Sequence, residues 1–433
     1  MKSKHTWLVS SLLLTSALTL SGVANGQTQA PVTISYWNIN TENFGGPAVR
    51  ELISRFEAKN SGIKVESRSF QNAYTGVLQG LQTSIAASDP PDVVQIGYLY
   101  TNYVRLNLPF VPTNDLAKKF GGEKFLAQFR ANILEQGQAE GVQVGLPYSL
   151  SNTMVYYNAD LFKKAGLNPD APPLSWAAWR SAAKLIKIRT GKFGLYINTL
   201  DDNWTTEALM ASNGGNLIGC QDGMSVATFD SPQAAEALQT WADLVKDGFA
   251  LNALAPQGEQ AFLAGESSAF VATIAKRAAL QANAKFDLKG APFPRFGTKH
   301  TRLPGGGNVL VVFSKDTAKQ EAAWKFMQYL TSPEGFTVWT KGTGYAPLIR
   351  GLDRDENYLK GFVAQNPMQR IGIQQLSNVF RWTAFPGANG LAASQALFKA
   401  TQRALGGQAS AKDALAQGAL EVNNLIKGEK CKK

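Results

Sequence analysis

Histidine is almost missing from this chain of 433 residues, which contains only two. His5 lies in an N-terminal segment that we expect to be removed, so a histidine-based catalytic triad would have to use His300, in a turn expected to be exposed. The motifs G-x-S-x-G, H-E-x-x-H and G-x-x-x-x-G-K-[ST] are also absent. We therefore predict no enzyme of these kinds and no bound cofactor.

Cysteine is equally scarce, because Cys220 and Cys431 are the only two. An oxidising compartment permits a disulfide between them. Cys431 lies close to the C-terminus, where chains are often mobile, which argues against the pairing. The disulfide stays open on the sequence alone, and two cysteines make a metal site a poor expectation.

Long apolar runs are missing except at the N-terminus. Lys2 and Lys4 precede an apolar run over residues 8–20, and small residues follow at 22–26, the pattern of a secretory signal peptide over residues 1–26. No cysteine follows the run, so no lipid attachment site is expected, and no later stretch reaches the roughly 18 apolar residues of a membrane span. The sequence predicts a soluble periplasmic or extracellular protein.

Positive charge is in excess, at +11, but it is spread along the chain and forms no basic run. The densest group, Lys430, Lys432 and Lys433, is typical of a solvated tail. Nucleic acid is therefore not an expected partner. A hydrophobic content of 44% supports sizeable cores, and the length after the leader suits two or three domains of roughly 150 residues.

Strands and helices are predicted to alternate from Val32 onward. Residues 32–36 alternate apolar and polar side chains, residues 47–59 place apolar side chains on one helical face, and residues 93–96 form a short apolar strand. This rhythm predicts parallel strands joined by helices, hence an α/β sheet whose ligands gather beyond the carboxyl ends of the strands. A second α/β unit is predicted from Trp176, and residues after 348 are predicted to be mostly helical.

Several segments, each weak alone, together resemble a known family. They are Pro147–Asn158 leading into Asp160–Leu167, the arm Pro172–Trp176, the glycines 305–307 before an apolar strand, Pro333–Glu334, and the run Thr343–Pro347. In this order they resemble the extracellular solute-binding proteins of bacterial ABC importers, in the carbohydrate-type group that includes maltose-binding and glycerol-3-phosphate-binding proteins. The resemblance covers essentially the whole chain after the leader.

The resemblance implies an α/β fold of the two-lobed periplasmic-binding-protein kind, similar to type II, with the ligand in the cleft between the lobes. It places residues 27–150 and 309–343 in the first lobe, and residues 151–308 and 344–433 in the second. Three crossovers would join the lobes: the first within Pro147–Trp176, the second over Gly305–Leu310 and the third over Gly342–Leu348. Their glycines suit hinges because glycine absorbs backbone rotation at least steric cost.

The same resemblance implies a set of ligand contacts. A sugar needs short polar groups for its hydroxyls and flat aromatic surface for its ring faces. For Trp204 a place in the core is an equally reasonable interpretation. The implied contacts are Asn40, Glu42, Tyr74 and Tyr98 from the first lobe, Trp204 from the second, and Ser151, Asn152, Gly306, Gly307 and Tyr345 from the crossovers.

The ligand class remains open between two alternatives. Glycerol-3-phosphate binders of this family place an arginine in the late polar segment, where this chain has Pro386, although Arg381 lies nearby. We therefore favour a neutral sugar over a phosphorylated polyol or phosphodiester. A secreted glycosidase using Glu42, Asp201 or Asp202 is a distant alternative. The expected partners are a small carbohydrate-type ligand and the permease and ATPase subunits of an importer.

Overall fold

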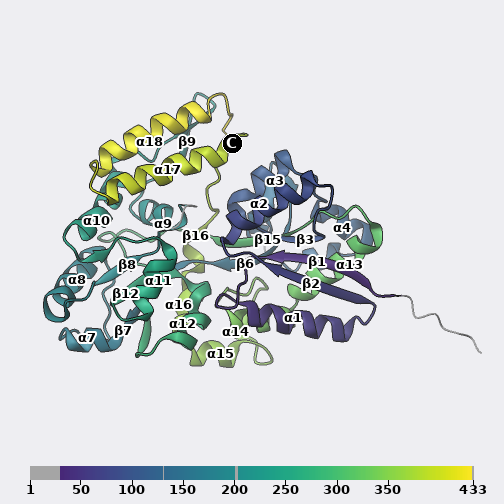
Figure 1. Ribbon diagram of the computed structural model, residues 1–433, viewed down its shortest axis with the longest axis horizontal. Helices are drawn as coiled ribbons and strands as arrows, with labels where there is room; N and C mark the ends of the chain where they lie inside the picture. Colours follow the sequence, from purple (N-terminus) through teal and green to yellow (C-terminus); the bar gives the residue numbers. More distant parts are fainter. Residues whose placement is uncertain (1–29, 130, 200–202, 432–433) are drawn as a thin grey trace, which may run out of the picture.

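The computed structural model describes residues 30–129, 131–199 and 203–431. The expected signal peptide and the glycosidase candidates Asp201 and Asp202 lie outside the described residues. Two lobes, each built on a five-stranded sheet, lie side by side (Figure 1). Among the described helices, none is both long and apolar enough to cross a membrane.

The first lobe has a mixed sheet covered by helices on both faces. Its strands β1, β2 and β3 are parallel, as the alternation predicts, whereas β15 is antiparallel to both of its neighbours. The strand order is β2 (Ile63–Ser69), β1 (Val32–Asn38), β3 (Val93–Gly97), β15 (Gly306–Val312), β6 (Leu146–Ser151). The helices include α1 (Gly46–Lys59), α2 (Ala73–Ala86), α3 (Thr101–Asn107), α4 (Thr113–Phe120), α13 (Thr317–Leu330) and α14 (Pro333–Gly342).

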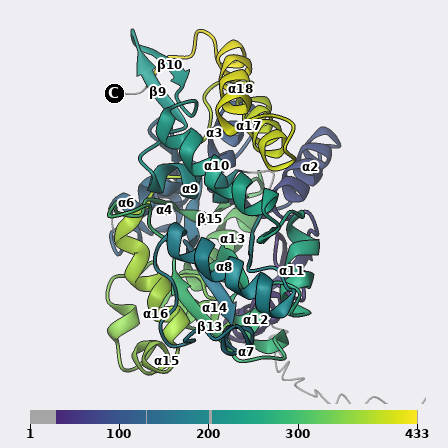
Figure 2. The same cartoon turned by 90° about the vertical axis from the view of Figure 1, so that its left-hand side faces the viewer.

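The second lobe repeats this plan with a second mixed sheet. Its strand order is β11 (Ala250–Leu251), β8 (Leu195–Ile197), β12 (Ala269–Thr273), β7 (Thr153–Asn158), β13 (Leu288–Pro292). Figure 2 looks at this lobe from outside, with α8 and α10 in front and α17 and α18 above them. The helices include α7 (Ala159–Lys164), α8 (Trp176–Thr190), α9 (Trp204–Ser212), α10 (Pro232–Lys246), α11 (Ala255–Leu263), α12 (Arg277–Asn283), α16 (Pro367–Gln374), α17 (Gly390–Leu405) and α18 (Ala411–Leu425).

Helix starts follow the capping signals in the sequence. Asn158 caps α7, because its side-chain oxygen accepts from two backbone amides of the first turn. Ser175 and Ser231 cap α8 and α10 in the same way. These caps satisfy N–H groups that a helix otherwise leaves without partners, so they fix where each helix begins.

The chain passes between the lobes at short crossovers. The first is Asn152, which separates β6 of the first sheet from β7 of the second. The second precedes Gly306, where β15 begins by pairing with Ser151, so the whole of β15 lies in the first sheet, three residues ahead of the expected boundary. After the third crossover, Leu352 and Leu359 still pack in the first-lobe core, and α16 packs on the second sheet.

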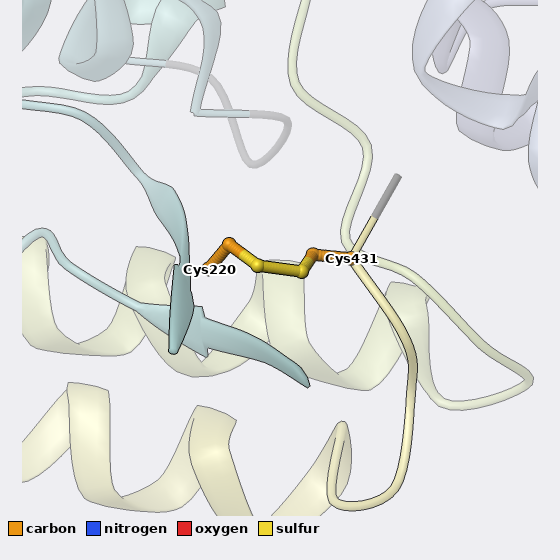
Figure 3. The surroundings of a disulfide bond; sticks show 2 residues. All are labelled: Cys220 and Cys431. Carbon is orange, nitrogen blue, oxygen red and sulfur yellow. A yellow bond between two sulfur atoms is a disulfide. The ribbon is translucent and has the colours of Figure 1, made fainter. Parts of the chain in front are cut away.

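The C-terminal tail is tied to the second lobe by a disulfide between Cys220 and Cys431, whose Cα atoms are 5.6 Å apart (Figure 3). Cys220 lies on β9 (Ile218–Gln221), which pairs with β10 (Met224–Ala227). The tail adds to this hairpin, since Ser225 N donates to Glu429 O at 2.8 Å. The structure therefore closes the question that the sequence left open about these cysteines.

Candidate functional site

A buried hydrogen-bond network lies at the carboxyl ends of β1 and β3, the region where ligands gather in open α/β sheets. Gln95 Nε2 donates to Asn40 Oδ1 at 2.9 Å, and Asn308 Nδ2 donates to the Tyr74 hydroxyl at 3.0 Å and, at 3.5 Å, toward Gln95 Oε1. The Tyr74 hydroxyl is in turn hydrogen bonded to Tyr345. Five distant segments of the chain thus meet in one polar cluster.

The orientation of each amide in this network follows from a backbone carbonyl. Asn40 Nδ2 donates to Phe44 O at 3.1 Å, so Asn40 Oδ1 must be an acceptor. Gln95 therefore presents its amide nitrogen to Asn40 and its oxygen to Asn308. Asn308 Oδ1 then has no hydrogen-bond donor among the described residues, although it is buried. A buried carbonyl oxygen without a donor is costly.

The tyrosines around the network remain neutral. Burial raises the pKa of Tyr74 and of Tyr98 well above the ordinary value, and it raises the pKa of Tyr345 to about 12. Tyr98 donates to Ser149 O at 2.8 Å, a bond that the fold itself uses. The Tyr345 ring stacks on Trp339, with centroids 5.5 Å apart. These side chains offer flat surface and hydroxyl groups but no charge.

Trp204 lies at the junction of the lobes. It begins α9 of the second lobe, yet it packs in the first-lobe hydrophobic cluster with 3% of its surface exposed. Its Nε1 donates to Pro304 O at 2.9 Å, and Trp382 lies 6.4 Å away between ring centroids. A Cβ on Gly306 would lie 2.8 Å from the Trp204 ring and from Ser151 Oγ, so glycine is needed for this close approach.

Two asparagines of the second lobe also have buried amide oxygens to which no described residue donates. Asn198 follows β8, at the carboxyl end of a parallel strand, and Asn203 precedes Trp204. Asn203 Nδ2 donates to Ser394 O at 2.8 Å, which fixes its amide and leaves Oδ1 as an acceptor. Neither Asn198 Oδ1 nor Asn203 Oδ1 has a donor among the described residues.

The remaining predicted contacts lie elsewhere or are used by the fold. Glu42 is two-thirds exposed, and its carboxylate accepts hydrogen bonds from both terminal nitrogens of Arg50, so the structure does not bring it into the network. Asn152 uses both ends of its amide within the second lobe, donating to Gly372 O at 2.7 Å and accepting from Gln375 at 2.9 Å. Gly307, with φ +135°, passes beside Tyr98.

The charged and metal-binding candidates do not join this site. Arg381 donates to Gln138 O in the first lobe, so its guanidinium is engaged outside the network. His300 lies exposed. Across residues 30–129, 131–199 and 203–431, no group of three or more His, Cys, Asp or Glu side chains is placed to hold a metal ion.

Sequence reasoning missed Gln95, Asn308, Asn198 and Asn203 as site residues. Gln95 and Asn308 each lie in an otherwise apolar strand, and that interruption was the available signal, since a buried amide in a central strand needs a partner. Asn198 and Asn203 carried no signal beyond the general polarity near Trp204. The structure identifies Gln95 by its hydrogen bonds to Asn40 and Asn308, and it identifies the three asparagines because their buried oxygens lack donors among the described residues.

Two lobes joined by crossovers, with polar and aromatic groups gathered at their junction, define a periplasmic-binding-protein fold. Residues 51–364 match the model of the family described as bacterial extracellular solute-binding protein, and the chain belongs to this family. The fold class and the family expected from the sequence are therefore confirmed.

Relatives of two kinds are similar to this chain. The sn-glycerol-3-phosphate-binding periplasmic protein UgpB of Escherichia coli K12 is 26% identical over 384 residues, covering 84% of each chain. The structure of UgpB from Mycobacterium tuberculosis in complex with glycerophosphocholine matches with a TM-score of 0.80 and 22% identity, over 91% of this chain and 98% of that one. Maltose-bound MalE3 of T. maritima matches with a TM-score of 0.78 and 21% identity, over 91% and 100%.

Proposed function

We propose that this chain is the substrate-binding component of an ABC importer, and that it captures a neutral, hydroxyl-rich solute of the sugar class outside the cytoplasmic membrane. The ligand would bridge the lobes, and its higher affinity for the closed arrangement would shift the lobes toward closure. A membrane permease would recognise the closed form, and ATPase subunits would supply the energy. Family membership supports the transport role.

One observation carries the ligand class. Three buried carbonyl oxygens lack a donor among the described residues: Asn308 Oδ1 near the start of β15 in the first lobe, and Asn198 Oδ1 after β8 and Asn203 Oδ1 before α9 in the second. Carbonyl oxygens accept hydrogen bonds, so a ligand must bring donors to them. Sugar hydroxyls donate and accept, whereas the oxygens of an ionised phosphate only accept. The three acceptors therefore favour a ligand with several hydroxyl groups, which a sugar supplies in greater number than the two hydroxyls of glycerol-3-phosphate or glycerophosphocholine.

A phosphorylated ligand is the second candidate, because relatives are named for glycerol-3-phosphate and glycerophosphocholine. Lys276 follows β12 at the carboxyl end of that strand and lies 5.3 Å from the centre of the Phe44 ring. Its ammonium group is already paired with Glu259 at 2.5 Å. A phosphate would have to compete with that carboxylate, which supports the neutral ligand as the first candidate.

A thermal-shift panel separates the candidates. Neutral mono- and oligosaccharides, glycerol-3-phosphate and glycerophosphocholine are added to the mature protein, and a true ligand at about 100 times its Kd adds roughly 2.7 kcal/mol of stability. We expect saturable stabilisation by a neutral sugar. Stabilisation by the phosphorylated compounds alone would select the second candidate, and a flat response throughout would reject both.

Matched variants sharpen the same panel. Lys276→Gln leaves the affinity for a neutral sugar nearly unchanged but weakens a phosphate ligand, because a charge-assisted hydrogen bond contributes about 1.5–3 kcal/mol. Lys285→Gln is the control, since Lys285 is exposed. Incubation with glycosides tests the glycosidase alternative, and detectable turnover would overturn the binding-protein assignment.

A further inference from the structure

The C-terminal end of α14, in the first lobe, is capped by an arginine from the second lobe. Arg277, the first residue of α12, donates from Nη2 to Thr340 O at 3.1 Å and to Lys341 O at 2.6 Å. The last carbonyl groups of a helix have no partner within the helix and carry partial negative charge. A cation at this position therefore satisfies the helix end across the boundary between the lobes.

Neighbouring carbonyl groups of the third crossover are held in the same way. Thr343 O accepts from Ala278 N at 2.8 Å, and Gly344 O accepts from Gln369 Nε2 at 3.1 Å, both donors belonging to the second lobe. Gly344 has φ +148°, and a Cβ there would lie 2.1 Å from Ile274 O. The crossover is therefore pressed against the second lobe along its length.

Arg277 is buried, and the hydrogen bonds that its guanidinium donates to the described residues go to carbonyl and amide oxygens rather than to carboxylates. Its Nε donates to Gln369 at 3.0 Å, its Nη1 donates to Gln281, and its guanidinium plane lies 5.0 Å from the centre of the Phe362 ring. Burying a cation costs free energy unless dipoles and hydrogen bonds replace its hydration. Here carbonyl and amide oxygens from both lobes do so, and the planar fork of arginine is what reaches them together.

We propose that Arg277 is a positioning residue that pins the third crossover, so that the lobes turn about the joint between α12 and α14. Tyr345 follows Gly344 directly and is hydrogen bonded to Tyr74 of the network. The hydrogen bonds of Arg277 to Thr340 O and Lys341 O therefore set both the angle between the lobes and the position of the Tyr345 ring. This role goes beyond ligand binding itself, and its test needs no ligand.

The test is Arg277→Ala in the mature protein without ligand. We expect a larger radius of gyration in small-angle X-ray scattering, because the lobes lose their fixed joint, and amide exchange at Ala278 faster by at least about tenfold. Guanidinium chloride at tens of millimolar, far below denaturing concentrations, should fill the vacated position and restore both values. Urea at equal concentration, neutral and of similar shape, should not.

Controls keep the proposal falsifiable. Arg370→Ala removes an exposed guanidinium that donates to Ala364 O at 3.0 Å, and it should leave both measurements unchanged. Arg277→Lys keeps the charge but loses the fork, so an intermediate exchange rate is expected, and this variant decides the matter if the alanine variant does not fold. Native scattering and native exchange in the tested variant, or equal rescue by urea, would overturn the proposal.

Discussion

Asn203 occupies a backbone conformation that few residue types tolerate, with φ at +62°. Asparagine is among the residues that enter this left-handed region, and here its amide also donates to Ser394. Its remaining oxygen is one of the three acceptors that the proposed ligand would satisfy. Substitutions at Asn203 can therefore separate its effect on stability, which depends on the left-handed backbone, from its effect on ligand affinity, which depends on the side-chain oxygen.

We expect Asn203→Gly and Asn203→Ala to weaken ligand binding equally, by roughly 2- to 10-fold, because both remove one neutral hydrogen bond. Their stabilities should differ, since alanine pays about 1 kcal/mol or more for the left-handed conformation and glycine does not. Calorimetric titration gives the affinities and urea unfolding gives the stabilities. Full affinity in the glycine variant would show that Asn203 faces no ligand.

At this scale the sequence predicted types of residue better than their partners. Asn40, Tyr74 and Tyr345 were expected near one another, and the structure joins them in one network. The sequence could not reveal that Asn308 forms a hydrogen bond with Tyr74, because those residues lie 234 positions apart. For Trp204 both interpretations survive, since the ring is buried and also lies at the lobe junction.

Among the elements, the helices were the most predictable because their signals are local. The predicted helix over residues 47–59 matches α1, and α8 begins at Trp176, where the second α/β unit was predicted to start. Strand pairing was less accessible. β7 and β15 are antiparallel to their neighbours, which follows from chain passages between lobes rather than from any property of the strands.

The hairpin of β9 and β10 pairs with the C-terminal tail, and the disulfide between Cys220 and Cys431 ties that tail to the hairpin. The bond between Cys220 and Cys431 closes a loop of 211 residues, so its loss would enlarge the conformational freedom of the unfolded chain. We expect Cys220→Ser/Cys431→Ser to lower the free energy of unfolding by about 2–4 kcal/mol. Urea unfolding of this variant, compared with the native protein before and after reduction, measures the loss. An unchanged midpoint in both comparisons would show that the tail is held by its backbone bonds alone.

The described residues form three hydrophobic clusters, one centred on the first lobe and two in the second. Trp179 and Trp241 lie in the second-lobe core, whereas Trp204 and Trp382 leave second-lobe elements to pack in the first-lobe cluster. Such packing holds the lobes together where the site lies. The family resemblance predicted two lobes, but only the coordinates show which side chains cross between them.

Buried tyrosines give the molecule a defined response to alkaline pH. Nine described tyrosines have pKa values raised chiefly by burial, to about 12 for Tyr345. An unfolded tyrosine titrates near 10. Above about pH 10 the unfolded state therefore binds fewer protons than the folded state, and stability falls as pH rises. The buried Arg277, whose pKa burial lowers to about 10, acts in the opposite direction, as does Arg381, whose pKa burial also lowers, but these are two groups against nine.

We therefore expect the free energy of unfolding to change little with these groups between pH 7 and 9 and to fall steeply between about pH 10 and 12. Urea unfolding across this range, with tyrosinate absorbance recorded in parallel, is the measurement. Tyr345→Phe removes one titrating group and should flatten the slope by about 1.4 kcal/mol per pH unit. The chain has twelve tyrosines, so an absorbance change near pH 10 that corresponds to more than three tyrosinates, in protein that is still folded, would contradict the burial of the other nine.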